Sequence, residues 1–159
     1  MGAKGEAFAK QFETKAQEVT ATLERLSDTD WKKVTASEKW PVGVVAHHIA
    51  SSHQGICGIL KMLADGKPGP NIPMDMIHAG NAKHAQEFAN VTKADTLALH
   101  KSNVAAAATT LRGIGDAEFD RSGPVLSGLP AMSAGQLAGG LLVGHMDEHL
   151  GSIKATVGH

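Results

Sequence analysis

Two histidines near the C-terminus have the spacing of metal ligands. His145 and His149 are separated by three residues in a stretch that reads as a helix. Residues four apart on a helix differ by about 40° of arc and one turn of rise, so both imidazoles leave the same face. Imidazole nitrogens are common ligands of zinc and other transition metals. The pair therefore predicts half of a metal site.

The pair lies within the apolar stripe of its helix. Several apolar side chains fall within about 100° of His145 on the helical wheel: Ala138, Leu141, Leu142, Met146 and Ile153. A neutral imidazole buried in that stripe needs a partner for each ring nitrogen. Hydrogen bonds within the core would satisfy this need without an ion, so that alternative stays open.

The same residues, His145-Met146-Asp147-Glu148-His149, also spell the inverted zinc-protease signature. That signature requires a further carboxylate ligand downstream. None of the ten residues after His149 is acidic. The sequence therefore disfavours a protease.

A third ligand is sought among the histidines of the segment from about 41 to 65. Its apolar residues define a core face, and His48 lies at the edge of that face. His47 lies about 165° from the centre of the face and is predicted to be a solvated surface residue. His53 lies about 75° from the centre, on the flank opposite His48, and its role is left open.

Apolar periodicity predicts helices at about 5–27, 41–65, 75–90 and 93–113, with a last helix capped by Ser133. Thr92 is the expected cap of the fourth of these segments. A proline-rich loop at 66–73 and an irregular link at 115–131 interrupt the pattern. We expect an all-α protein, an antiparallel four-helix bundle, with residues 1–159 forming one domain.

Composition narrows the function classes. The chain has 15 basic and 16 acidic residues, so nothing indicates nucleic-acid binding. The single cysteine, Cys57, excludes an internal disulfide framework and fits a reducing compartment. The polar start and the lack of a long apolar run predict a cytoplasmic protein without a membrane span.

Two stretches carry a resemblance to a known family. Trp40-Pro41-Val42-Gly43-Val44-Val45-Ala46-His47-His48 resembles a family pattern in which a histidine follows a tryptophan by eight residues on the second bundle helix. Gly144-His145-Met146-Asp147-Glu148-His149-Leu150 is similar to the C-terminal HxxxH motif of the same family, the DinB-like, YfiT-like metal-binding four-helix bundles. By position, the motif histidines are His48, His145 and His149.

The resemblance implies a divalent ion, zinc or nickel, held by three histidines. Some members transfer low-molecular-weight thiols such as bacillithiol or mycothiol onto electrophiles, and others isomerise maleylpyruvate. The isomerases typically have glutamate where this chain has His145, and they carry a C-terminal extension, so an isomerase is disfavoured. The expected partners are a small-molecule substrate or thiol, with a homodimer possible.

The expected function is metal-dependent thiol transfer. The alternatives are a metal-dependent hydrolase and a non-catalytic, stress-associated metal-binding bundle. A fourth protein ligand such as His53 or His78 would favour the last, because structural sites are closed. Cys57 is predicted to be structural, and Glu148 to be solvated or to orient a neighbouring imidazole. The role of Asn81 is left open.

Overall fold

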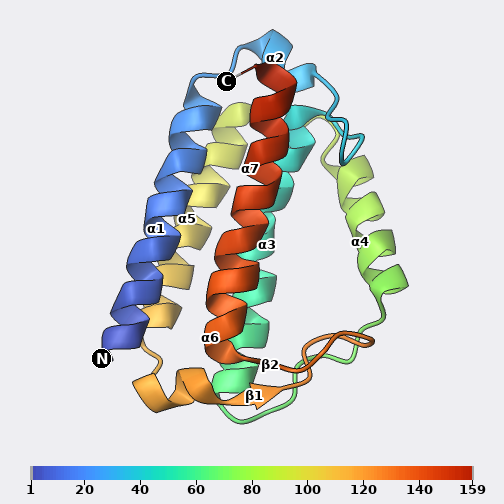
Figure 1. Ribbon diagram of the computed structural model, residues 1–159. Helices are drawn as coiled ribbons and strands as arrows, with labels where there is room; N and C mark the ends of the chain where they lie inside the picture. Colours follow the sequence, from blue (N-terminus) through green and yellow to red (C-terminus); the bar gives the residue numbers. More distant parts are fainter. Residues whose placement is uncertain (1, 159) are drawn as a thin grey trace.

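Four long helices pack side by side, and a fifth lies against their outer side. The computed structural model describes residues 2–158. The bundle helices are α1 (Ala3–Glu24), α3 (Val42–Ala64), α5 (Lys93–Arg112) and α7 (Gly144–Val157). The outer helix, α4 (Met74–Glu87), stands beside α3 (Figure 1). The expected all-α four-helix bundle is confirmed.

The helices run in two directions. α1 and α7 point one way and α3 and α5 the other (Figure 1). The antiparallel pairing of α1 with α5 is visible in Arg112, near the end of α5, which binds Glu6 and Glu13 of α1. α3 and α5 are parallel neighbours, because α4 carries the chain back along the bundle before α5 begins. Each bundle helix thus has one antiparallel and one parallel neighbour.

A single apolar core fills the bundle. Phe12, Leu23, Ile49 and Leu111 are fully buried in it. The core also contains a hydrogen-bonded pair: the His100 Nε2–H group donates to the carbonyl of Ala16, and its Nδ1 lies 3.2 Å from Nε2 of His53. A neutral His100 then accepts from His53. These bonds join α1, α5 and α3.

Helix ends follow the predicted chemistry. Thr92 and Ser133 accept hydrogen bonds from the backbone N–H groups of Asp95 and Gln136, as expected for N-caps. Pro41 immediately precedes α3. The short helix α2 (Asp28–Lys32) covers the bundle end, where Trp31 donates to the carbonyl of Val91. Trp31 is partly buried against the apolar core.

The C-terminal helix departs from the simple wheel. It begins as α6 (Ala134–Gln136), widens into a π-helix (Leu137–Val143) and continues as α7. A π-helix bonds residues five apart, so angles counted at 100° per residue from His145 do not hold before Gly144. A Cβ added at Gly135 would lie 3.3 Å from the backbone oxygen of Phe119, and one at Gly139 would lie 3.8 Å from the ring of Phe8, whereas one at Gly140 would meet nothing within 4 Å.

The predicted irregular link contains a 3₁₀ helix (Asp116–Asp120) and one short strand. Strand β1 (Ser122–Gly123) pairs antiparallel with β2 (Met132–Ser133). Among the described residues, no helix is both long and apolar enough to cross a membrane.

Candidate metal centre

The three predicted ligands converge on one point. His48 comes from α3, and His145 and His149 come from successive turns of α7. One nitrogen of each ring lies within 4.8 Å of the other two. The segments that form the site are about 100 residues apart in the sequence. They meet because α3 and α7 are adjacent helices of the bundle.

The two nearest nitrogens of the cluster belong to His48 and His145. Nε2 of His48 lies 3.1 Å from Nε2 of His145. The ring centres are 4.9 Å apart, and the ring planes are inclined by 57°. This separation is that of a hydrogen bond between the rings and also that of two ligands of one ion.

A carboxylate that the sequence analysis missed orients the third predicted ligand, His149. The Nδ1–H group of His149 donates to Oε1 of Glu38 at 2.8 Å, and the hydroxyl of Ser152 donates to Oε2 at 2.6 Å. This bond leaves the lone pair of a neutral His149 on Nε2. A carboxylate that orients a ligating histidine in this way is common in metal sites.

The sequence did not indicate a role for Glu38, because Glu38 lies in the loop before α3, 111 residues from His149. The neighbouring Lys39 has a φ of 61°, in the left-handed region that few residues other than glycine adopt. The sequence does not reveal that Lys39 adopts this backbone conformation. In the structure, the positive φ of Lys39 indicates that the loop next to Glu38 is constrained.

Burial keeps His48 and His145 neutral. Desolvation, followed by the charges of His145 and His149, lowers the pKa of His48 to about 3. Desolvation and then His149 lower the pKa of His145 to about 4. Burial raises the pKa of Glu38, but hydrogen bonds, first among them that from Ser152, more than offset this and keep it ionised. Neutral imidazoles beside an anionic carboxylate are the forms a cation requires.

These residues fit a divalent transition metal. Two nitrogens that each lie about 2.0–2.1 Å from a metal, at angles between 90° and tetrahedral, are roughly 2.9–3.4 Å apart. The 3.1 Å between His48 and His145 falls in this range. The set of three imidazoles suits zinc or nickel and leaves positions for a further ligand. Nδ1 of His145 is buried without a hydrogen-bond partner among the described residues.

Comparisons with known proteins agree with this architecture. The family model of the DinB superfamily matches residues 11–153. The chain belongs to the DinB superfamily. A search of curated proteins finds no match.

Two solved structures share the DinB fold with this chain. YfiT from Bacillus subtilis, described as a probable metal-dependent hydrolase with an unusual four-helix bundle topology, is 19% identical with a TM-score of 0.72. The match covers 97% of this chain and 87% of YfiT. The mycothiol-dependent maleylpyruvate isomerase is 12% identical with a TM-score of 0.74, over 94% of this chain. The chain spans only 60% of the isomerase's length.

The prediction for His47 was wrong. Its side chain is not solvated: the residue is only 6% exposed. Its ring stacks on Phe88 with centres 4.0 Å apart and is hydrogen-bonded to His84. The wheel placed His47 away from the bundle core, but α4 and the residue that follows it cover that side of α3.

The other histidines between residues 2 and 158 lie outside the cluster. His53 faces α5 and is paired with His100, so it is not the fourth ligand that the sequence left open. His78 is exposed on α4, and Asn81 is half-buried there. Glu148 is exposed, and among the described residues no hydrogen bond links it to the cluster. Of the two predicted roles of Glu148, the structure therefore agrees with a solvated carboxylate.

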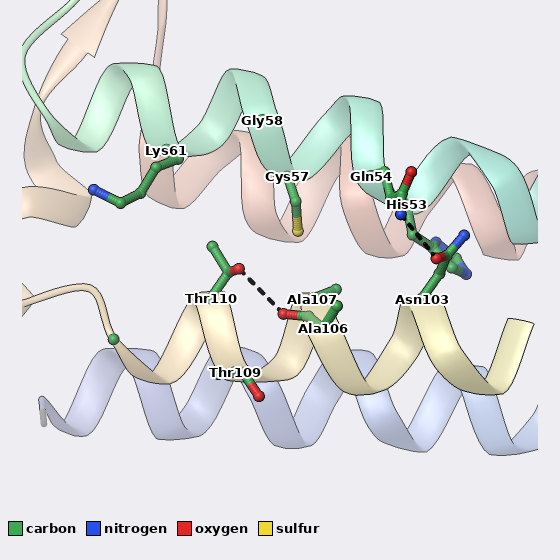
Figure 2. Close-up of a pocket in the computed structure, with 11 residues that line it drawn as sticks. His53, Gln54, Cys57, Gly58, Lys61, Asn103, Ala106, Ala107, Thr109 and Thr110 are labelled. Carbon is green, nitrogen blue, oxygen red and sulfur yellow. Dashed lines mark hydrogen bonds between the residues drawn. The ribbon is translucent and has the colours of Figure 1, made fainter.

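Cys57 lies on another side of α3. It borders a cavity of about 370 Å³ between α3 and α5, and no ligand histidine lines this cavity (Figure 2). Burial raises the pKa of the Cys57 thiol to about 11, so it stays protonated at neutral pH. Since the thiolate is the reactive form, Cys57 is not a nucleophile. Its predicted structural role agrees with this position.

Proposed function

We propose that this DinB-superfamily chain is a metal-dependent enzyme that transfers a low-molecular-weight thiol to a small electrophile. The observation that carries the proposal is the convergence of His48, His145 and His149 with Glu38 behind one of them. Three neutral protein ligands leave positions for an exogenous ligand, which a closed structural site would lack. Zinc or nickel is the expected ion.

The bound ion would supply a Lewis acid that favours the thiolate form of a thiol at neutral pH. The chain's residues would hold it in place: Glu38 fixes the ring of His149, and α3 and α7 hold the other two rings. The attacking sulfur must come from a small molecule, because the protein's own thiol at Cys57 is protonated and distant from the cluster.

Hydrolysis is the second candidate. The likeness to YfiT, which is described as a probable metal-dependent hydrolase, favours it. The same three histidines would then present water in place of a thiol. A site without catalysis is the third alternative, and it predicts metal binding with no turnover.

A thiol screen separates these functions. Metal-loaded protein is mixed with bacillithiol, mycothiol, glutathione or cysteine and a model electrophile across a range of pH. Transfer predicts a rate above that of the His145→Ala variant, with a pH profile displaced to lower pH than the uncatalysed reaction. If no thiol reacts faster with wild type than with the variant, thiol transfer is rejected for these four, and ester hydrolysis is assayed next.

A further inference from the structure

α4 brings a further histidine against the metal site. His84 lies in its last turn, and its ring centre is 5.7 Å from that of His48. Nε2 of His84 lies 2.7 Å from Nδ1 of His47. The ring is therefore held against two successive residues of α3, one of which is a ligand.

The other nitrogen of His84 is free to bind something else. Nδ1 is buried and has no hydrogen-bond partner among the described residues. The two nitrogens of an imidazole lie on different edges of the ring, so Nδ1 faces away from the bond to His47. Buried polar atoms are rarely left unpaired, and those that are commonly mark a ligand site.

The rest of α4 supports a role in covering the site. None of its residues is buried, so α4 adds little to the core. Its side toward α3 carries the half-buried Ile77 and Asn81. Phe88, directly after the helix, stacks on His47. α4 is thus fastened to the bundle beside His48.

We propose that His84 recognises a carboxylate on the thiol that occupies the metal centre. This inference rests on the proposed thiol-dependent function. When the Nδ1–H group of His47 donates to Nε2 of His84, a neutral His84 carries its own proton on Nδ1. A carboxylate near the sulfur would accept a hydrogen bond from this N–H group. His84 is then a specificity-determining residue, and α4 is the helix that positions it.

The test measures thiol binding to the cobalt-substituted protein. Thiolate coordination to Co²⁺ produces a charge-transfer absorption band, which is titrated with mercaptoacetate and with ethanethiol. His84→Phe keeps an aromatic ring between Phe88 and α3 but removes both nitrogens. We expect it to weaken mercaptoacetate binding about 3- to 10-fold, the effect of one lost hydrogen bond, and to leave ethanethiol binding unchanged. His78→Phe, at an exposed position of the same helix, should bind both thiols as wild type does.

The outcomes are distinct. If His84→Phe binds both thiols with the wild-type affinity ratio, the role of His84 is refuted while thiol binding stands. If neither thiol gives the band with wild type, the thiol-dependent function fails, and the inference fails with it. Cobalt stoichiometry is measured first, because loss of cobalt from His84→Phe alone would identify His84 as a ligand of the ion and overturn its assignment to the carboxylate.

Discussion

Glu38 determines which nitrogen of His149 faces the other two rings. Its carboxylate accepts the Nδ1–H bond, so removing it frees the ring to rotate and to change tautomer. We expect Glu38→Ala to raise the metal dissociation constant about 10- to 100-fold, measured by competition with a chromogenic chelator. Glu148→Ala is the control, because Glu148 is exposed. Equal affinities in the two variants would contradict this role of Glu38.

At the residue scale, the grouping of His48, His145 and His149 was predictable and its surroundings were not. Spacing placed His145 and His149 on one face, and resemblance added His48. The error at His47 arose because a helical wheel describes one helix in isolation. The polar, alanine-rich sequence of α4 gave no sign that its His84 would cover His47. Glu38 was missed because a loop has no periodicity.

At the scale of elements, α3 offers a matched pair of glycines. A Cβ at Gly43 would lie 2.3 Å from the Trp31 ring nitrogen, so Gly43→Ala must displace α2. We expect a loss of about 1–3 kcal/mol in the free energy of unfolding. At Gly58 an added Cβ meets nothing within 4 Å, and Gly58→Ala should gain about 0.5–1 kcal/mol from helix propensity. Urea unfolding checks both values, and a loss at Gly58 or a gain at Gly43 would contradict the packing described.

The positions of α1 and α3 were predictable because apolar residues recur in them at helical spacing, and Thr92 and Ser133 marked the starts of α5 and α6 as N-caps. The π-helix before α7 was not predicted, since its glycines were interpreted as close approaches to a neighbouring helix or to a ligand. The sequence also did not indicate the crossover connection between α3 and α5. Short loops favour antiparallel neighbours, but α4 returns the chain along the bundle and makes α3 and α5 parallel.

At the scale of the whole molecule, buried histidines make the metal-free protein sensitive to acid. Burial lowers the pKa of His53 to about 3 and also lowers that of His100. The unfolded chain binds protons at these groups below about pH 6.5 more readily than the folded chain does, so stability falls as pH falls from there, in the case of His53 until about pH 3. The expected slope is at most about 1.4 kcal/mol per pH unit for each group.

Urea unfolding of metal-free protein between pH 7 and pH 5 measures this slope. His53→Leu removes one such group and should flatten the dependence. His78→Leu, at an exposed position, should leave the slope as in wild type. A slope unchanged by His53→Leu would show that His53 does not resist protonation in the folded protein.

The central claim is that His48, and not its neighbour His47, holds an ion together with His145 and His149. Elemental analysis of protein purified without a metal-affinity tag tests it most directly. We predict about one zinc or nickel ion per chain in wild type and in His47→Ala, and essentially none in His48→Ala, because two remaining ligands bind too weakly. Wild type without metal, or equal metal content in His48→Ala and His47→Ala, would contradict the claim.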